Sequence, residues 1–230
     1  MTTTAVSPGY ADLPRLIALM TGDDKHTAAA QSTVDVLWVL YDRVLDLTPA
    51  TFREPGRDRF LLSKGHGPMA YYAVLTAKGF LDEAELADWS SVRSRLGHHP
   101  DRRRVPGVEI SSGSLGHGLP IAVGTALGVR ARGYAGRVVT LVGDAEFDEG
   151  SNIEAVVLAG RLGLEQLTAV VVDNQSSSHG WPGGIARRFE VEGWETRTVS
   201  GRDHEALYEA FTTAHPGRPL AVVAVVEPKG

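Results

Sequence analysis

Two short apolar runs on either side of a helix-like segment constrain the fold of this chain more than any other feature. Val138–Val142 and Thr168–Val172 are largely apolar, as are strands that are buried on both faces. Between them, Asn152–Leu164 carries apolar residues at helical spacing. A strand, a helix and a strand in this order predict two neighbouring parallel strands joined by a crossover helix. We therefore expect an α/β fold, with a mostly parallel sheet sandwiched by helices.

The rest of the chain fits one domain of the same class. At 230 residues the chain is long enough for one well-buried α/β core, and its length does not require a second domain. Hydrophobic periodicity predicts helices at 11–20, 33–47, 69–78, 119–130 and 204–214, strands at 196–199 and 220–226, and irregular segments at 48–57, 94–110 and 176–188. We expect residues 1–230 to form a single domain.

Each of the two central strands is followed by a polar residue, Asp144 after the first and Asn174 after the second. Parallel neighbours deliver both to the carboxyl edge of the sheet, where open α/β sheets bind their ligands. Magnesium prefers about six oxygens and seldom takes all of them from protein. Asp144, Asn174 and the backbone carbonyl of Ser176 could supply three, and a diphosphate could add more. Either residue alone is common in a turn or at a strand end, but the pair predicts a magnesium–diphosphate site.

Composition excludes several classes of function. The net charge of −5 gives no basic footprint for nucleic acid, so no nucleic-acid partner is expected. The sequence contains no cysteine, which excludes disulfides and thiolate chemistry on these residues. The first residues lack the pattern of a signal peptide, and no apolar run approaches the roughly 20 residues of a membrane span. A cytoplasmic protein without a membrane partner is the expectation.

Ordered motifs run along nearly the whole chain, from about Asp24 to Glu227. Gly143-Asp144 is followed one strand later by Asn174. Residues 25–35 share His26, Ser32 and Asp35 with the pattern Gly-His-Pro-Gly-Gly-x-x-Ser-x-x-Asp. Three further segments are Phe60–Gly67, similar to Ser-x-Gly-His-Ala, His99-Pro100-Asp101, similar to His-Pro-Glu, and Gly113–Gly118, similar to Gly-Pro-Leu-Gly-Gln-Gly. The first pair resembles the thiamine diphosphate-binding motif, and the set as a whole resembles the transketolase family.

This resemblance implies two cofactors and the residues that bind them. The implied fold is the diphosphate-binding (PP) type of thiamine diphosphate-binding domain, with Mg²⁺ held by Asp144, Asn174 and Ser176. The residues implied to contact thiamine diphosphate are His66, Gly113, Ser114, Leu115, Gly143, Asp144, Ala145, Glu146 and Asn174.

The same resemblance implies catalytic residues. Family counterparts of His26, His66 and His99 line the channel above the cofactor, where they bind substrate oxygens and assist proton transfer. Imidazole suits this work because it donates, accepts and titrates near neutral pH. Glu149 and Glu154 match acidic family positions near the subunit contact, and Glu149 is assigned here as catalytic. The alternative for Glu149 is an ordinary acidic first turn, which the helix dipole favours anyway.

The sequence departs from the family pattern in two motifs and lacks one domain. Ala145 replaces the second glycine of Gly-Asp-Gly, and His117 replaces a glutamine. Nothing in residues 1–230 resembles the domain that binds the aminopyrimidine ring. The resemblance therefore implies a split enzyme, in which a separate pyrimidine-binding subunit completes the site, most simply as an α2β2 assembly.

The expected function is transfer of a two-carbon ketol or acyl unit from a ketose or keto-acid donor to an aldehyde or ketone acceptor. One alternative is a pyruvate-type acyl transferase or keto-acid dehydrogenase subunit, and another is a non-catalytic accessory subunit. Arg102-Arg103-Arg104 is expected to be a solvated loop cluster, with a contact to a phosphorylated substrate as the second interpretation.

Overall fold

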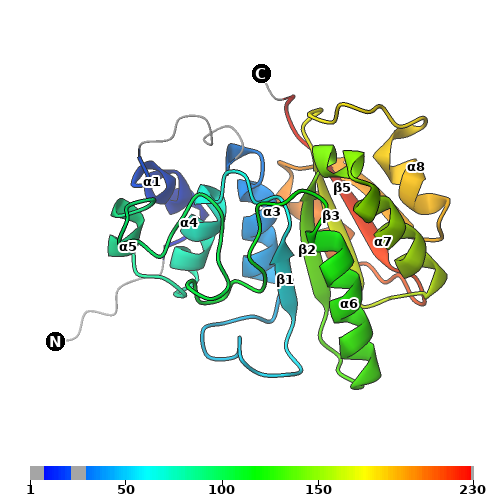
Figure 1. Cartoon of the computed structure of the whole chain (residues 1–230), viewed down its shortest axis with the longest axis horizontal. Helices are drawn as coiled ribbons and strands as arrows, with labels where there is room; N and C mark the ends of the chain where they lie inside the picture. The colour runs from blue at the N-terminus through cyan, green and yellow to red at the C-terminus, as the bar shows by residue number, and fades with distance from the viewer. Residues whose placement is uncertain (1–7, 22–29, 229–230) are drawn as a thin grey trace.

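A parallel β-sheet forms the centre of the fold in the computed structural model, which describes residues 8–21 and 30–228. Within these residues the sheet has five strands in the order β1-β2-β3-β5-β4, and every neighbouring pair is parallel. The strands are β1 (Arg59–Leu62), β2 (Val138–Gly143), β3 (Leu167–Asp173), β4 (Glu195–Ser200) and β5 (Leu220–Val225). The carboxyl ends of these strands lie uppermost in Figure 1.

Helices cover both faces of this sheet (Figure 1). The core on the first face includes residues of α1 (Leu13–Ala18), α3 (Val34–Val39), the π-helix η3 (Leu40–Val44), α4 (Met69–Ala77), α5 (Ala84–Ala87) and α9 (His204–Thr212), and η1 (Tyr10–Asp12) leads directly into α1. The second face packs against α6 (Gly118–Ala131), α7 (Gly150–Arg161) and α8 (Gly184–Glu190), and the short 3₁₀ helix η4 (Asp144–Asp148) follows β2 at the upper edge.

The central strand β3 shows how a continuous apolar run supplies two cores. Val170 and Val172 are fully buried in the core under α3 and α4, whereas Ala169 and Val171 are fully buried in the core under α6 and α7. Successive side chains of a strand point to opposite faces, so each residue serves one core. This two-sided burial is why the sequence of a central parallel strand shows no polar alternation.

The predicted α/β class and the strand–helix–strand unit are confirmed. β2 pairs with β3 in parallel register, Val138 opposite Leu167 and Gly143 opposite Val172. Two expectations were wrong. The segment 176–188 was expected to be irregular, but α8 begins at Gly184, where Ile185 and Phe189 pack one helical turn apart on the second core.

The second error concerns the edge strand β1, for which no strand was expected. Its four residues are too few for a clear period, although Phe60 and Leu62 face one core and Leu61 faces the other. The helix expected over 33–47 is also divided, since α3 gives way to the π-helix η3 at Leu40. In the described ranges, no helix is both long enough and apolar enough to cross a membrane.

Candidate functional site

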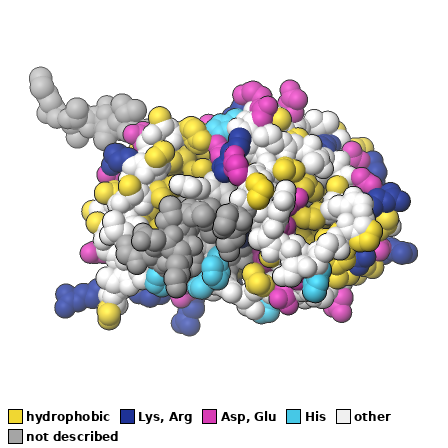
Figure 2. Space-filling view, turned by 90° about the horizontal axis from the view of Figure 1, so that it is seen from above, with side chains coloured by type: hydrophobic (Ala, Val, Ile, Leu, Met, Phe, Trp, Pro, Cys, Tyr) yellow, Lys and Arg dark blue, Asp and Glu magenta, His cyan; other side chains and the backbone are white. Residues whose placement is uncertain are grey.

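The carboxyl ends of β2 and β3 bring Asp144 and Asn174 to the same edge of the sheet. Gly143 pairs with Val172, so Asp144 follows the last residue of β2 while Asn174 follows the last residue of β3. Both side chains are almost completely buried, at 1% and 6% exposure. Figure 2 looks onto the molecule from above, and most of the histidine side chains visible there lie along one side of this face.

The carboxylate of Asp144 holds the segment that follows β3. Its Oδ1 accepts a hydrogen bond of 2.6 Å from the Ser176 hydroxyl, and its Oδ2 accepts from the backbone N–H groups of Ser176 and Ser177 at 2.6 and 3.1 Å. Gln175 has a left-handed backbone with φ of 57°, which reverses the chain between Asn174 and Ser176. The three residues predicted to bind the metal are therefore brought together.

Asn174 gives a direct test of whether these residues fit a bound cation. Its Oδ1 is buried and has no hydrogen-bond partner in the part of the chain that the structure describes. Leaving a polar atom buried and unpaired costs about 1–3 kcal/mol, so such an atom calls for a ligand. An amide oxygen beside a buried carboxylate is a donor set for a hard cation such as Mg²⁺. The residues present fit the metal.

A second aspartate, which the sequence reasoning did not assign, holds the same segment from the other side. Asp148 accepts hydrogen bonds from the Ser177 hydroxyl at 2.7 Å and from the backbone N–H groups of Ser178 and His179 at 2.8 and 3.2 Å. Partial burial works to raise the pKa of Asp148, but these hydrogen bonds outweigh it and lower the pKa below its ordinary value. Two features of the sequence could have identified Asp148. It lies one helical turn after Asp144, and a run of serines follows the next strand.

Glu146 is buried beneath the edge and joins three of the predicted cofactor segments. Its Oε1 accepts from the Ser63 hydroxyl at 2.7 Å and from the Gly116 N–H at 3.2 Å, and its Oε2 accepts from the Gly143 N–H at 2.9 Å. The Ser63 hydroxyl in turn accepts from the N–H of Gly118 at 3.0 Å. Burial raises the pKa of Glu146, although these hydrogen bonds partly oppose the rise. The carboxylate of Glu146 is thus engaged with the protein's own loops.

Glycines let the loops at this edge approach each other closely. A Cβ on Gly65 would lie 2.8 Å from the backbone nitrogen of Gly113. Gly113 itself has a φ of +133°, and a Cβ there would lie 3.0 Å from the imidazole ring of His99. A residue larger than glycine therefore does not fit at Gly65 or Gly113. The segment 113–115 packs closely against His99 and against the loop that follows β1.

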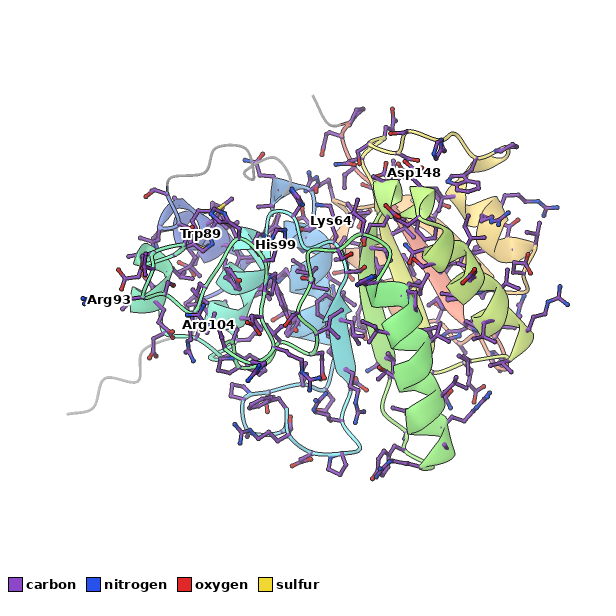
Figure 3. All side chains as sticks on the ribbon, in the orientation of Figure 1. Lys64, Trp89, Arg93, His99, Arg104 and Asp148 are labelled. Carbon is purple, nitrogen blue, oxygen red and sulfur yellow. The ribbon has the colours of Figure 1, made fainter. Side chains whose placement is uncertain are left out.

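Two of the predicted catalytic histidines lie together. The rings of His66 and His99 are 5.5 Å apart between centroids and meet edge to face at 74°. His66 is exposed, whereas His99 is partly buried. Figure 3 shows that His99 and Lys64, which lies two residues before His66, come from neighbouring loops near the upper edge. His26 lies outside the described residues.

The other predicted residues lie around the same edge. Ser114, Leu115 and His117 are exposed, Ala145 is partly buried, and Glu149 and Glu154 are exposed at the start of α7. The Ser151 hydroxyl donates 2.8 Å to the Gly116 carbonyl, which ties this end of α7 to the segment 113–118. Because Glu154 is exposed, its charged carboxylate does not carry the desolvation cost of a buried charge.

Asp35, which matches a family motif, is itself buried and lies in a separate network whose other members are partly exposed. It accepts hydrogen bonds from the Tyr10 hydroxyl at 2.5 Å, from Arg202 Nη1 at 2.7 Å and from His204 Nε2 at 2.8 Å. Burial works to raise the pKa of Asp35, but the hydrogen bonds from Tyr10, His204 and Arg202 together outweigh it and lower the pKa. Arg202 also donates to the Gln31 carbonyl at 2.7 Å, so the network fastens α3 and the residues before it.

Comparison with known proteins identifies the family to which this chain is similar along most of its length. Residues 16–225 match the family model described as "Transketolase, thiamine diphosphate binding domain". The chain is 32% identical over 206 residues to "6-deoxy-6-sulfo-D-fructose transketolase subunit SqwG" of a Clostridium species, covering 86% of this chain and 75% of that protein. Its fold is similar to a solved transketolase from Leishmania mexicana with a TM-score of 0.79 and 25% identity, covering 95% of this chain and 36% of that one.

A further relative carries a different name. The chain is 56% identical over 218 residues to "Ferredoxin fas2" of Rhodococcoides fascians, covering 94% of this chain and 72% of that protein. Ferredoxin clusters are held by cysteine thiolates, and the sequence of this chain contains no cysteine. An iron–sulfur cluster of that kind therefore cannot form on these residues.

Proposed function

Because the chain belongs to the transketolase family and corresponds to its thiamine diphosphate-binding domain, we propose that it is the diphosphate- and Mg²⁺-binding subunit of a two-subunit transketolase. The observation that carries the proposal is the buried Oδ1 of Asn174, which has no partner among the described residues. Asn174 directly follows β3, and Asp144 directly follows the neighbouring strand β2. A carboxylate and a free amide oxygen at the carboxyl edge of a parallel sheet suit a cation that carries a phosphorylated ligand.

Specific residues would hold the two cofactors. Asp144, Asn174 and the backbone carbonyl of Ser176 would bind Mg²⁺, while the loops 113–115 and 143–145 would lie against the diphosphate. The hydrogen bonds that join Asp144 to Ser176 support this set, because they already fix two of its members together. When bound, thiamine diphosphate supplies the electron sink for breaking and forming carbon–carbon bonds.

The chain's own contribution to chemistry would be proton handling and substrate orientation. His66 and His99, whose rings contact each other beside the glycine-lined loop, would donate to and accept from hydroxyl groups of the donor. His26 is assigned the same role from its motif. Three imidazoles favour hydroxylated ketol donors over simple keto acids, which makes transfer of a two-carbon ketol unit the proposed reaction. Glu149, exposed at the start of α7, is proposed to act at the subunit contact.

A partner chain completes the proposed enzyme. The chain spans about 36% of the length of the solved transketolase that it resembles, and a relative is itself named as one subunit of a transketolase. We propose that a separate pyrimidine-binding subunit grips the other end of the cofactor, in an α2β2 assembly in the cytoplasm. Exposed apolar side chains on α6 and α7, among them Ile121 at 43% and Leu158 at 47% exposure, support a covered surface there.

The test measures cofactor binding and activity separately. Calorimetry with Mg²⁺ and thiamine diphosphate should show binding that Asp144→Ala abolishes and Asn174→Ala severely weakens, while the exposed control Asp88→Asn leaves it unchanged. Asp144→Ala and Asn174→Ala each remove an oxygen that would bind Mg²⁺ directly, and Mg²⁺ tolerates departures from octahedral geometry poorly. Unchanged cofactor affinity in Asp144→Ala would refute the site.

The two-subunit proposal is tested by mixing. The chain alone should be inactive with saturating cofactors, and adding a candidate pyrimidine-binding subunit encoded beside it should create turnover with ketose donors. Full activity of the single chain would contradict the split enzyme. Activity of the mixture with pyruvate alone would favour a keto-acid dehydrogenase-like subunit, and no cofactor binding by any mixture would favour an accessory role.

A further inference from the structure

An arginine-lined pocket lies away from the carboxyl edge and takes no part in the proposed reaction. It has a volume of about 250 Å³, and its lining residues are Phe52, Arg53, Arg102, Arg103, Arg104, Val105, Pro106, Gly107 and Val108. Phe52 and Arg53 belong to the segment that leads into the first residue of β1, at the amino end of the sheet. In Figure 3 Arg104 lies well below Lys64 and Asp148, which mark the opposite edge.

The positive charge of this pocket is not neutralised by its lining. Four of its lining residues are arginines and none is acidic. Arg104 donates 2.6 Å to the Ser94 carbonyl, which uses one of its five N–H groups. The guanidinium groups of Arg53, Arg102 and Arg103 make no hydrogen bond or ion pair with the described residues, and Arg53 only stacks on Phe52 at 5.3 Å. Most of the N–H donors therefore remain available.

Nearby carboxylates are already engaged elsewhere. Asp101 Oδ1 accepts from the backbone N–H of Arg103 at 2.8 Å and from the Ser111 hydroxyl at 3.1 Å. Glu109 forms an ion pair with Arg57. Asp101 still attracts the charges of Arg103 and Arg104, but neither acidic side chain lines the pocket. With four arginines in the lining, the local charge is positive although the chain as a whole carries −5.

The backbone that presents the arginines is fixed. The Arg102 N–H donates 3.1 Å to the Ser111 hydroxyl, and the N–H groups of Arg104 and Val105 donate to the Asp101 carbonyl at 3.1 and 2.9 Å. A turn that is held in place before a ligand arrives loses less conformational freedom on binding, which strengthens the interaction. The arginines thus share a small pocket on a preorganised turn.

We propose that this arginine pocket is a binding site for a small phosphate-class anion, separate from the thiamine diphosphate site. Guanidinium groups bind phosphate oxygens through paired, charge-assisted hydrogen bonds. The volume is below the roughly 300–1,000 Å³ of pockets for drug-sized ligands, so it suits a phosphate ion or a small phosphomonoester and not a peptide.

Calorimetry on the chain alone, without Mg²⁺ or thiamine diphosphate and at constant ionic strength, tests the proposal. Inorganic phosphate and glycerol 3-phosphate are titrated separately to distinguish a free ion from a phosphomonoester. At least one should bind at a single saturable site with a dissociation constant of about 1 mM or below. Arg53→Gln and Arg103→Gln should each weaken that binding about tenfold or more.

The matched control is Arg132→Gln, which removes the same charge from an exposed position at the end of α6 and should leave binding unchanged. Thermal melting of all three variants confirms that they are folded. Binding that is absent, or equally strong in Arg103→Gln, would overturn the proposal, since phosphate would then be screening charge or occupying the cofactor edge. Tighter binding of hexaglutamate than of either phosphate would also overturn it, in favour of docking to an acidic protein surface.

Discussion

The hydroxyl of Ser63 donates a hydrogen bond of 2.7 Å to Oε1 of Glu146, across a sequence separation of 83 residues. Both residues are almost completely buried, with exposures of 2% for Ser63 and 1% for Glu146. Ser63 follows β1, and Glu146 follows β2 within η4. The bond therefore links the ends of two neighbouring strands at the level of the proposed cofactor.

Glu146→Gln should destabilise the protein. Its new amide group would place N–H donors against the N–H groups of Gly143 or Gly116, which now donate to the carboxylate. The expected loss in the free energy of unfolding is about 1–3 kcal/mol, measured by urea denaturation. Glu154→Gln, at an exposed position on α7, is the control and should stay within about 0.5 kcal/mol of the wild type. Equal stability of the two variants would contradict a structural role for Glu146.

Asp35→Asn should lower stability in a pH-dependent way. The folded-state pKa of Asp35 is depressed, so its contribution is fully present above the unfolded pKa of about 3.9 and is lost as the pH falls through the folded value. At neutral pH the variant should lose about 1.5–3 kcal/mol, and the difference from the wild type should shrink below about pH 4. Urea unfolding at both pH values measures this, with exposed Asp88→Asn as control. A difference that stays constant with pH would rule out the charged network as its cause.

Two glycines of α6 should respond to alanine in opposite directions. A Cβ on Gly118 would lie 2.2 Å from Ser63 Cβ, so Gly118→Ala should cost about 1–3 kcal/mol or more. Gly124 has nothing within 4 Å of the same position, and Gly124→Ala should gain about 0.5–1 kcal/mol because alanine restricts the unfolded chain. Thermal melting of both variants gives the comparison, and a stable Gly118→Ala would show that β1 and α6 are less closely packed than described.

His66→Ala and His99→Ala should each reduce turnover of the assembled enzyme by about 10²-fold or more, as expected when a proton-transfer group is removed. Cofactor affinity should change little, which steady-state kinetics and calorimetry on the same preparations separate. His215→Ala, in the turn before β5 and away from the carboxyl edge, is the control. Normal rates in both active-site variants with every accepted donor would exclude the channel assignment.

Hydrophobic periodicity was enough to predict the helices and strands whose burial can be recognised from their own apolar pattern. β2 and β3 are continuous apolar runs because both faces are buried, and α7 is long enough to show its helical spacing. β1 could not be predicted because four residues give no reliable period, and its identity as a strand comes from pairing with β2. α8 begins at the second of two glycines, Gly183 and Gly184, which resemble a loop, and its Phe189 is recognisable only from its contacts with Phe147 and Trp194.

The candidate site was predictable as a set of residues but not as a set of contacts. Strand-end positions were sufficient to bring Asp144 and Asn174 together, since parallel neighbours share an edge. The role of Asp148 in holding Ser177–His179 depends on the left-handed Gln175, which no local pattern announces. The network around Glu146 depends on two loops that lie far away in the chain.

The position of β1 at the edge of the sheet has a consequence for the order of folding. β2 and β3 are separated only by α7, whereas β1 pairs with β2 although α4, α5 and α6 lie between them in the chain. Closing the longer loop costs more chain entropy, so we expect the β2–α7–β3 unit to form in the folding transition state and β1 to dock afterwards. The bond between Ser63 and Glu146 would then form late, and removing it would speed unfolding while leaving the folding rate nearly unchanged. Within the proposed cofactor edge, the side formed by β1 would therefore be the last to assemble and the first to open.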